Sequence, residues 1–90
     1  MALWLALAAP EGADLYNQGA RLYSQQQFEE AEHVLRQAVR KNPRSASARF
    51  LLGATLLQLR RNPEAVQELR AANQLNPGNI FNSFNVKILL

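Results

Sequence analysis

The 90-residue chain repeats its own sequence once at a fixed offset, and this internal period constrains the fold more than any other feature. Residues 12–45 align with residues 46–79 without a gap and are identical to them at ten positions. The identical pairs are Gly19 and Gly53, Ala20 and Ala54, Leu22 and Leu56, Glu30 and Glu64, Ala31 and Ala65, Leu35 and Leu69, Arg36 and Arg70, Ala38 and Ala72, Asn42 and Asn76, and Pro43 and Pro77. A period of about 20–50 residues indicates a tandem array in which each unit is one supersecondary element.

Each unit has the pattern of two helices. Within residues 13–25, Leu15, Gly19 and Leu22 recur at the spacing of one helical face. A glycine costs a helix about 1 kcal/mol relative to alanine. Its presence at the same place in both units, as Gly19 and Gly53, therefore predicts a close helix crossing. The second helix of each unit offers small residues seven apart that predict a complementary shallow groove: Ala31 and Ala38, then Ala65 and Ala72.

Proline residues mark the expected helix ends. The Asn-Pro pairs at 42–43 and 76–77 end the second helix of each unit, because proline disfavours helical geometry in the residue before it. A helix start is predicted at residues 62–64, where Asn62 caps, Pro63 fits the first turn and Glu64 faces the positive helix end.

The small and large residues at these spacings resemble the tetratricopeptide repeat (TPR) family over residues 12–79. The first unit supplies Leu15, Gly19, Leu22, Ala31, Leu35, Ala38 and Pro43, and the second supplies Leu52, Gly53, Leu56, Ala65, Leu69, Ala72 and Pro77. Gln18 and Arg49 depart from the pattern. The resemblance implies an all-α, right-handed α-α superhelix of about five helices, with repeats at 12–45 and 46–79.

Two end segments lie outside the complete repeats. Residues 1–11 are an apolar lead-in, expected either to cover the first face of the domain as a helix or to be the remnant of a signal or anchor. Residues 80–90 are expected to form a terminal helix, as an incomplete third repeat or a cap. Phe84 continues the series of Tyr16 and Phe50, since it follows Phe50 by the same step.

The composition offers little for catalysis. Cysteine is absent and His33 is the single histidine, so cysteine zinc sites and paired-histidine metal sites are excluded. His33 is expected to point away from the inward side of its helix, and Glu29, Glu30 and Glu32 open a helix, where they match its dipole. We expect no enzyme activity, no cofactor and no metal.

The net charge of +3 is mildly basic. Seven cations and no acid lie between residues 34 and 63: Arg36, Arg40, Lys41, Arg44, Arg49, Arg60 and Arg61. Several fall at helix C-termini, where cations are favourable. The alternative is an anionic partner, such as an acidic peptide, RNA or an anionic lipid surface. The density of cations is below that of a dedicated nucleic-acid binder, and nucleic acid is not the expected partner.

Stacked helix pairs present the first helix of each pair on a concave surface. By resemblance, the groove positions are Ala13, Tyr16, Asn17, Ala20, Tyr23 and Ser24 in the first repeat and Ser47, Phe50, Leu51, Ala54, Leu57 and Gln58 in the second, with Phe84 and Asn85 beyond. TPR domains that hold the carboxylate tails of chaperones use lysine and asparagine at places occupied here by Tyr16, Ala20 and Leu51. We therefore expect no carboxylate clamp.

The expected function is a non-catalytic protein–protein interaction module that binds a peptide or partner protein through this apolar and aromatic groove. Self-association is also expected, through Phe81, Phe84, Ile88 and Leu89, because two repeats and part of a third leave apolar surface uncovered. The alternatives are a structural protein that stacks end to end, or a basic surface that binds RNA or anionic lipid. The expected location is the cytoplasm, or an exported or periplasmic location if residues 1–10 are a signal remnant. Membrane contact is expected only through residues 1–10.

Overall fold

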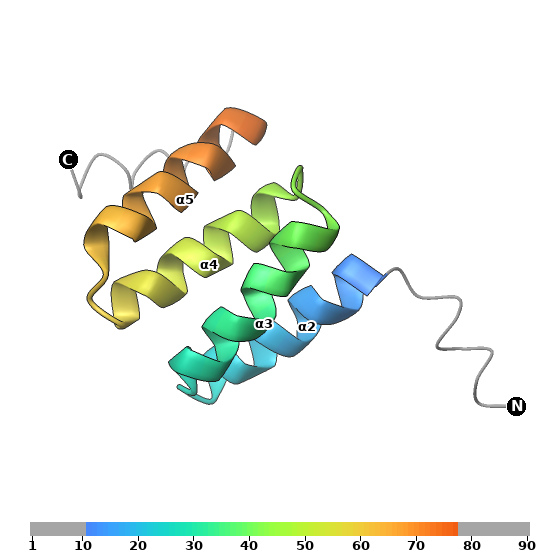
Figure 1. Cartoon of the computed structure of the whole chain (residues 1–90), viewed down its shortest axis with the longest axis vertical. Helices are drawn as coiled ribbons and strands as arrows, with labels where there is room; N and C mark the ends of the chain where they lie inside the picture. The colour runs from blue at the N-terminus through green and yellow to red at the C-terminus, as the bar shows by residue number, and fades with distance from the viewer. Residues whose placement is uncertain (1–10, 78–90) are drawn as a thin grey trace, which may run out of the picture.

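The computed structural model describes residues 11–77, and within this range the chain consists of α-helices joined by short turns (Figure 1). The four helices are α2 (Glu11–Ser24), α3 (Phe28–Lys41), α4 (Ala46–Gln58) and α5 (Asn62–Leu75). They form two helical hairpins, α2–α3 and α4–α5, and α3 packs against α4. The predicted all-α repeat architecture is confirmed. The expected lead-in segment up to residue 10 and the expected terminal helix at 80–90 lie outside the described residues.

The hydrophobic core lies where the two hairpins meet. Ala31, Leu35, Leu52, Leu56 and Ala65 form one cluster in which no residue is more than 1% exposed. Members of this cluster come from α3, α4 and α5, so the core joins the two repeats rather than filling each one separately. The repeats therefore stabilise one another, as expected for stacked units that cannot bury their apolar faces alone.

The glycines at equivalent positions of α2 and α4 allow the helices of each hairpin to approach closely. A Cβ atom on Gly19 would lie 2.6 Å from Cγ of Leu35, and one on Gly53 would lie 2.8 Å from Cγ of Leu69. The predicted close crossing is thus present, but its physical form differs from the expected fit against alanines. The glycine in each repeat receives a buried leucine side chain of the following helix, because leucine needs the volume that a Cβ would occupy.

Both hairpins turn through the same backbone motif. The amide of Gln26 donates to the carbonyl of Tyr23, and the amide of Gln27 donates to the carbonyl of Leu22. Arg60 and Arg61 make the same pair of bonds at the equivalent positions of the second repeat. This is the Schellman arrangement, whose turning residue adopts a left-handed conformation. The turning residues here are Gln26, with φ 62°, and Arg60, with φ 63°.

Glycine at either turning residue should stabilise the protein, because a side chain in the left-handed region costs about 1 kcal/mol that glycine does not incur. We expect Gln26→Gly to raise the free energy of unfolding by up to about 1 kcal/mol, measured by urea denaturation. Gln27→Gly is the control, since φ at Gln27 is −92°. That control should lower stability slightly. Equal effects of the two substitutions would contradict this explanation.

The helix starts differ in one respect from expectation. Arg61, not Asn62, is the N-cap of α5, and it makes no side-chain capping bond, so the helix begins one residue earlier than predicted. Pro63 lies in the first turn as predicted. A side-chain cap is present on α4, where the amide of Ala48 donates to Oγ of Ser45. The predicted ends of the second helices are confirmed, since Asn42 and Asn76 are their C-caps.

Four charged side chains link the second helices of the two repeats. Arg61 lies 2.7 Å from Glu32 and 2.8 Å from Glu64, and Arg36 lies 2.7 Å from Glu32 and 3.1 Å from Glu64. Separately, Arg49 lies 3.1 Å from Glu68. At least three of the seven cations between residues 34 and 63 therefore have carboxylate partners from the chain itself. Glu32 also serves this network rather than only the helix dipole, and the basic-surface interpretation is correspondingly weaker.

This network is expected to make the stability of the fold depend on pH. The hydrogen bond from Arg61 holds the pKa of Glu64 below its ordinary value of 4.5, against the opposing effect of desolvation. A depressed folded-state pKa contributes stability that is present above the ordinary pKa and is lost as the pH falls through the folded-state value. We expect the thermal midpoint to decrease from pH 6 to pH 3, and to decrease less in Glu64→Gln. An identical decrease in both proteins would contradict this role for Glu64.

Candidate binding groove

The groove positions form a repeated pattern of large, small and large side chains. On α2 these are Tyr16, Ala20 and Tyr23, and the residues at the same register positions on α4 are Phe50, Ala54 and Leu57. Spacings of four and three residues place each trio on one helical face. Since α2 and α4 are in contact, the two trios belong to neighbouring first helices. The expected result is a shallow surface with alanine between larger side chains.

The structure divides these predicted residues by burial. Tyr16, Tyr23, Leu51 and Leu57 are half-buried and pack against the core cluster. Ala20, Phe50 and Ala54 are also half-buried, whereas Asn17 is exposed. Phe84, Phe81, Ile88 and Leu89 lie outside the described residues. Tyr16, Tyr23, Leu51 and Leu57 therefore each have one side packed against the core cluster and another that reaches the surface.

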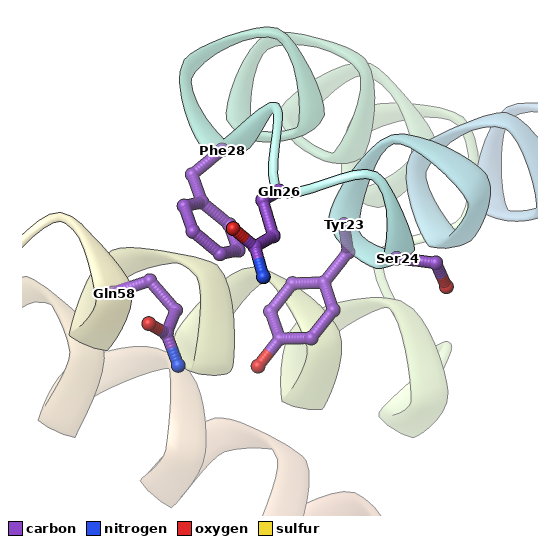
Figure 2. A pocket seen from close by; sticks show the side chains of 5 residues that line it. All are labelled: Tyr23, Ser24, Gln26, Phe28 and Gln58. Atoms are coloured by element: carbon purple, nitrogen blue, oxygen red, sulfur yellow. The ribbon is translucent and has the colours of Figure 1, made fainter.

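A pocket of about 420 Å³ opens where the turn of the first repeat meets the end of α4 (Figure 2). Its lining residues are Tyr23, Ser24, Gln26, Phe28 and Gln58. Tyr23, Ser24 and Gln58 are positions that the family resemblance assigned to the groove. Gln26 and Phe28 were missed, because they lie in the turn and at the start of α3, outside the first helix to which the groove mapping applies.

Aromatic packing shapes this pocket. The rings of Tyr23 and Phe28 meet edge to face, with centroids 5.3 Å apart and an interplanar angle of 69°. This geometry suits the aromatic quadrupoles. Oγ of Ser24 donates to the carbonyl of Ala20 at 3.0 Å, which leaves its lone pairs as acceptors. The amides of Gln26 and Gln58 supply both donors and acceptors.

The pocket carries no carboxylate, ammonium or guanidinium group among its lining residues. Its surface combines two aromatic rings with neutral hydrogen-bonding groups. Such a lining suits an uncharged stretch of polypeptide, whose side chains can lie on the rings while backbone amides meet the glutamines. Tyr16, Ala20 and Leu51 likewise offer no cation to a pair of carboxylates.

The side chains that could take part in catalysis or metal binding lie on the surface. His33 is exposed and lies 2.9 Å from the Gln37 amide. Glu29 and Glu30 are exposed in the first turn of α3. Within residues 11–77 no three histidine or acidic side chains gather in a way that could hold a metal ion. In the same range, no helix has the length and apolar character needed to cross a membrane.

Comparisons with known proteins agree with the repeat geometry. The family model described as "Tetratricopeptide repeat" matches residues 16–80. No curated protein matches the chain. Among solved structures, a chain of a "CopN-Scc3 complex" superposes with a TM-score of 0.83 at 20% sequence identity. The match covers 87% of this chain and 46% of that one, so this chain spans less than half of its length. At this identity the likeness establishes the fold alone.

Proposed function

Because the chain belongs to the tetratricopeptide repeat family, whose repeats generally mediate protein–protein interaction, we propose that it is a non-catalytic module that binds a polypeptide along α2 and α4. The partner is an extended or helical segment of apolar character. It lies across Tyr16 and Phe50 and reaches the neutral pocket at Tyr23 and Phe28.

The observation that carries this proposal is the matched large–small–large pattern on the neighbouring helices α2 and α4. Tyr16 and Phe50 are half-buried, so each side chain keeps part of its surface available, and Tyr16 also packs against the core cluster. Aromatic side chains fixed in this way dominate binding free energies at interfaces, because little conformational entropy is lost when a partner covers them. The small side chains of Ala20 and Ala54 lie between the larger ones on each helix and leave space there for a partner.

The test is a loss of affinity when the two rings are removed together. Peptides would be selected from a random library on the wild-type protein, and their affinities measured by fluorescence polarisation. Tyr16→Ala with Phe50→Ala should weaken the selected peptides by at least about tenfold, which corresponds to about 1.4 kcal/mol. Circular dichroism should show the helical signal retained.

The matched control is His33→Ala with Gln67→Ala. These two residues occupy equivalent positions of the two repeats, are exposed, and lie on the second helices α3 and α5. The control should leave the affinity unchanged. Peptides that bind the Tyr16 and Phe50 variant as tightly as wild type would remove the groove from the proposal and move the site to another face.

The proposal includes self-association through the apolar residues Phe81, Phe84, Ile88 and Leu89. Its support is energetic, because each large apolar side chain that leaves water contributes about 1.5–3 kcal/mol. Phe84→Asp should therefore reduce any associated form to the mass of a single chain, measured by light scattering. An unchanged mass would exclude Phe84 from the contact.

A further inference from the structure

The pocket at Tyr23 and Phe28 is formed by one repeat and is not a recurring feature of the two. All the residues that line it belong to the described part of the chain. In the second repeat the positions equivalent to Tyr23 and Phe28 hold Leu57 and Asn62, so the pair of aromatic rings is absent from these positions. Rings and neutral amides therefore come together where the first turn meets the end of α4, for a reason other than the repeat pattern (Figure 2).

Three polar groups on the wall of this pocket have no hydrogen-bond partner from the protein. They are the hydroxyl of Tyr23 and the carboxamides of Gln26 and Gln58, whose side chains make no hydrogen bond within residues 11–77. Figure 2 shows Gln26 beside the two rings and the amide end of Gln58 on the same side of the pocket as the Tyr23 hydroxyl. Ser24 differs, because its hydroxyl donates to the carbonyl of Ala20. The three remaining groups are available to a ligand.

The backbone holds Gln26 at this position. Its φ of 62° is fixed by the hairpin turn, in which the amide of Gln26 donates to the carbonyl of Tyr23. A residue with a side chain is disfavoured in this left-handed region relative to glycine. Because glycine would make the turn more stable, the Gln26 side chain is a candidate for a role in binding rather than in folding.

The lining disfavours two kinds of ligand group. It contains no charged side chain, so a carboxylate or an ammonium group that entered it would lose water without gaining an ion pair. An aliphatic side chain could cover the rings of Tyr23 and Phe28. It would also remove water from the unpartnered hydroxyl and amides and give them no hydrogen bond in return, which costs free energy.

A primary carboxamide meets both requirements. It is planar and uncharged, so its face can lie on an aromatic ring, and it carries two N–H donors and one carbonyl acceptor. The carboxamides of Gln26 and Gln58 offer the complementary acceptors and donors, and the Tyr23 hydroxyl adds one more of each. A glutamine or asparagine side chain presents this group from an extended or a helical segment alike, whereas the main-chain amides of a helix are already bonded to one another.

We propose that this pocket is a specificity-determining subsite for a glutamine or asparagine side chain of the partner polypeptide. The proposal rests on the proposed function, in which the partner lies along α2 and α4. Gln26, Gln58 and the Tyr23 hydroxyl bond to the carboxamide, and the rings of Tyr23 and Phe28 cover its flat face. The carboxamide thereby fixes where an otherwise apolar segment sits along the groove.

The test measures the preference for a carboxamide at each position of the peptides selected on the wild-type protein. Each position is replaced in turn by glutamine, glutamate, lysine and homoleucine, an aliphatic residue with the shape of glutamine. At one position, fluorescence polarisation should show binding at least about fivefold weaker with homoleucine, and about tenfold weaker with glutamate or lysine, than with glutamine. Peptides without any position that prefers glutamine in this way would overturn the subsite.

The variant Gln26→Gly with Gln58→Ala removes both carboxamides and keeps the left-handed turn, since glycine favours that backbone. It should bind the glutamine and homoleucine peptides within about twofold of each other, with the helical circular dichroism signal retained. The matched control is Gln25→Ala with Gln67→Ala, two exposed glutamines outside this pocket, and it should keep the wild-type preference. A preference that persists without Gln26 and Gln58 would overturn the assignment to this pocket.

A second probe separates the subsite from the groove. N-acetylglutaminamide alone, added to the nitrogen-labelled full chain, should shift the side-chain amide resonances of Gln26 and Gln58 and leave that of Gln67 in place. N-acetylhomoleucinamide should not. Shifts at Gln26 and Gln58 together with peptides that ignore the loss of Tyr16 and Phe50 would support the subsite and overturn the groove. Unshifted Gln26 and Gln58 resonances would overturn the subsite and leave the groove to its own test.

Discussion

Leu69→Ala is expected to lower the free energy of unfolding by about 2–5 kcal/mol, the range observed when a fully buried leucine is truncated. Leu69 is 0% exposed and fills the space beside Gly53, so no neighbouring side chain can readily replace the lost volume. Against a total stability of about 5–15 kcal/mol for a small domain, this loss should move the urea midpoint sharply or unfold the chain. The measurement is the loss of the helical circular dichroism signal during urea titration.

Two further variants make this result interpretable. Leu69→Met conserves volume and should lower the free energy of unfolding by less than about 1.5 kcal/mol. Gln67→Ala, on the exposed side of the same helix, should change it by no more than about 0.5 kcal/mol. If Leu69→Ala were as mild as the exposed substitution, the contact between Leu69 and Gly53 would not be a determinant of the fold.

The helical repeat architecture was predictable because the sequence repeats itself at a fixed offset. The recurrence of residues 12–45 as 46–79 predicts two helices in each repeat, and the proline residues predict the ends of α3 and α5 and the start of α5 to within one residue. The partner of each glycine was not predictable. The spacing shows that Gly53 needs a close neighbour, but it does not show whether alanines or Leu69 fill the space, because that depends on the rotation of the two helices about their axes.

The links that the charged network makes between the two repeats could not have been read from the sequence. Glu32 and Arg61 belong to different repeats, as do Arg36 and Glu64, so no local spacing rule connects the partners of either pair. A run of seven cations without an acid therefore left an open basic surface as the alternative to cations placed at helix C-termini. The tertiary fold brings Glu64, Glu32 and Glu68 to Arg36, Arg61 and Arg49, respectively. Only the pairs of Glu32 with Arg36 and of Arg61 with Glu64 have a local spacing that the chain itself shows.

The candidate groove likewise contains residues that the sequence predicted and residues that it did not. Tyr23, Ser24 and Gln58 line the pocket and were obtained from the positions that the family uses. Phe28 was not predicted to line a binding site. Its equivalent in the second repeat is Asn62, so comparison of the two repeats does not mark this position as aromatic. Its contact with Tyr23 depends on the turn at Gln26, and a left-handed glutamine is not signalled by residue type as a glycine would be.

Gly53→Ala should reverse its effect on stability when Leu69 is shortened. In the wild-type chain the added Cβ would lie 2.8 Å from Cγ of Leu69 and 3.3 Å from the carbonyl oxygen of Ala65. Such overpacking costs about 1–3 kcal/mol, which exceeds the gain of up to about 1 kcal/mol in helix propensity. In the Leu69→Ala background the leucine is gone, so the propensity gain remains and the cavity is partly filled. There the same substitution should raise the free energy of unfolding.

A double-mutant cycle measured by urea denaturation isolates this coupling, because the two residues are in direct contact. Ser47→Ala is the control for propensity, since Ser47 is exposed on the same helix and its substitution should have the same effect in both backgrounds. A destabilising Gly53→Ala of equal size in both backgrounds would mean that Leu69 is not what requires the glycine. A change of sign confined to Gly53 would establish that the glycine of α4 and the leucine of α5 act as a single unit, and the equivalence of Gly19 and Leu35 would extend that result to the first repeat.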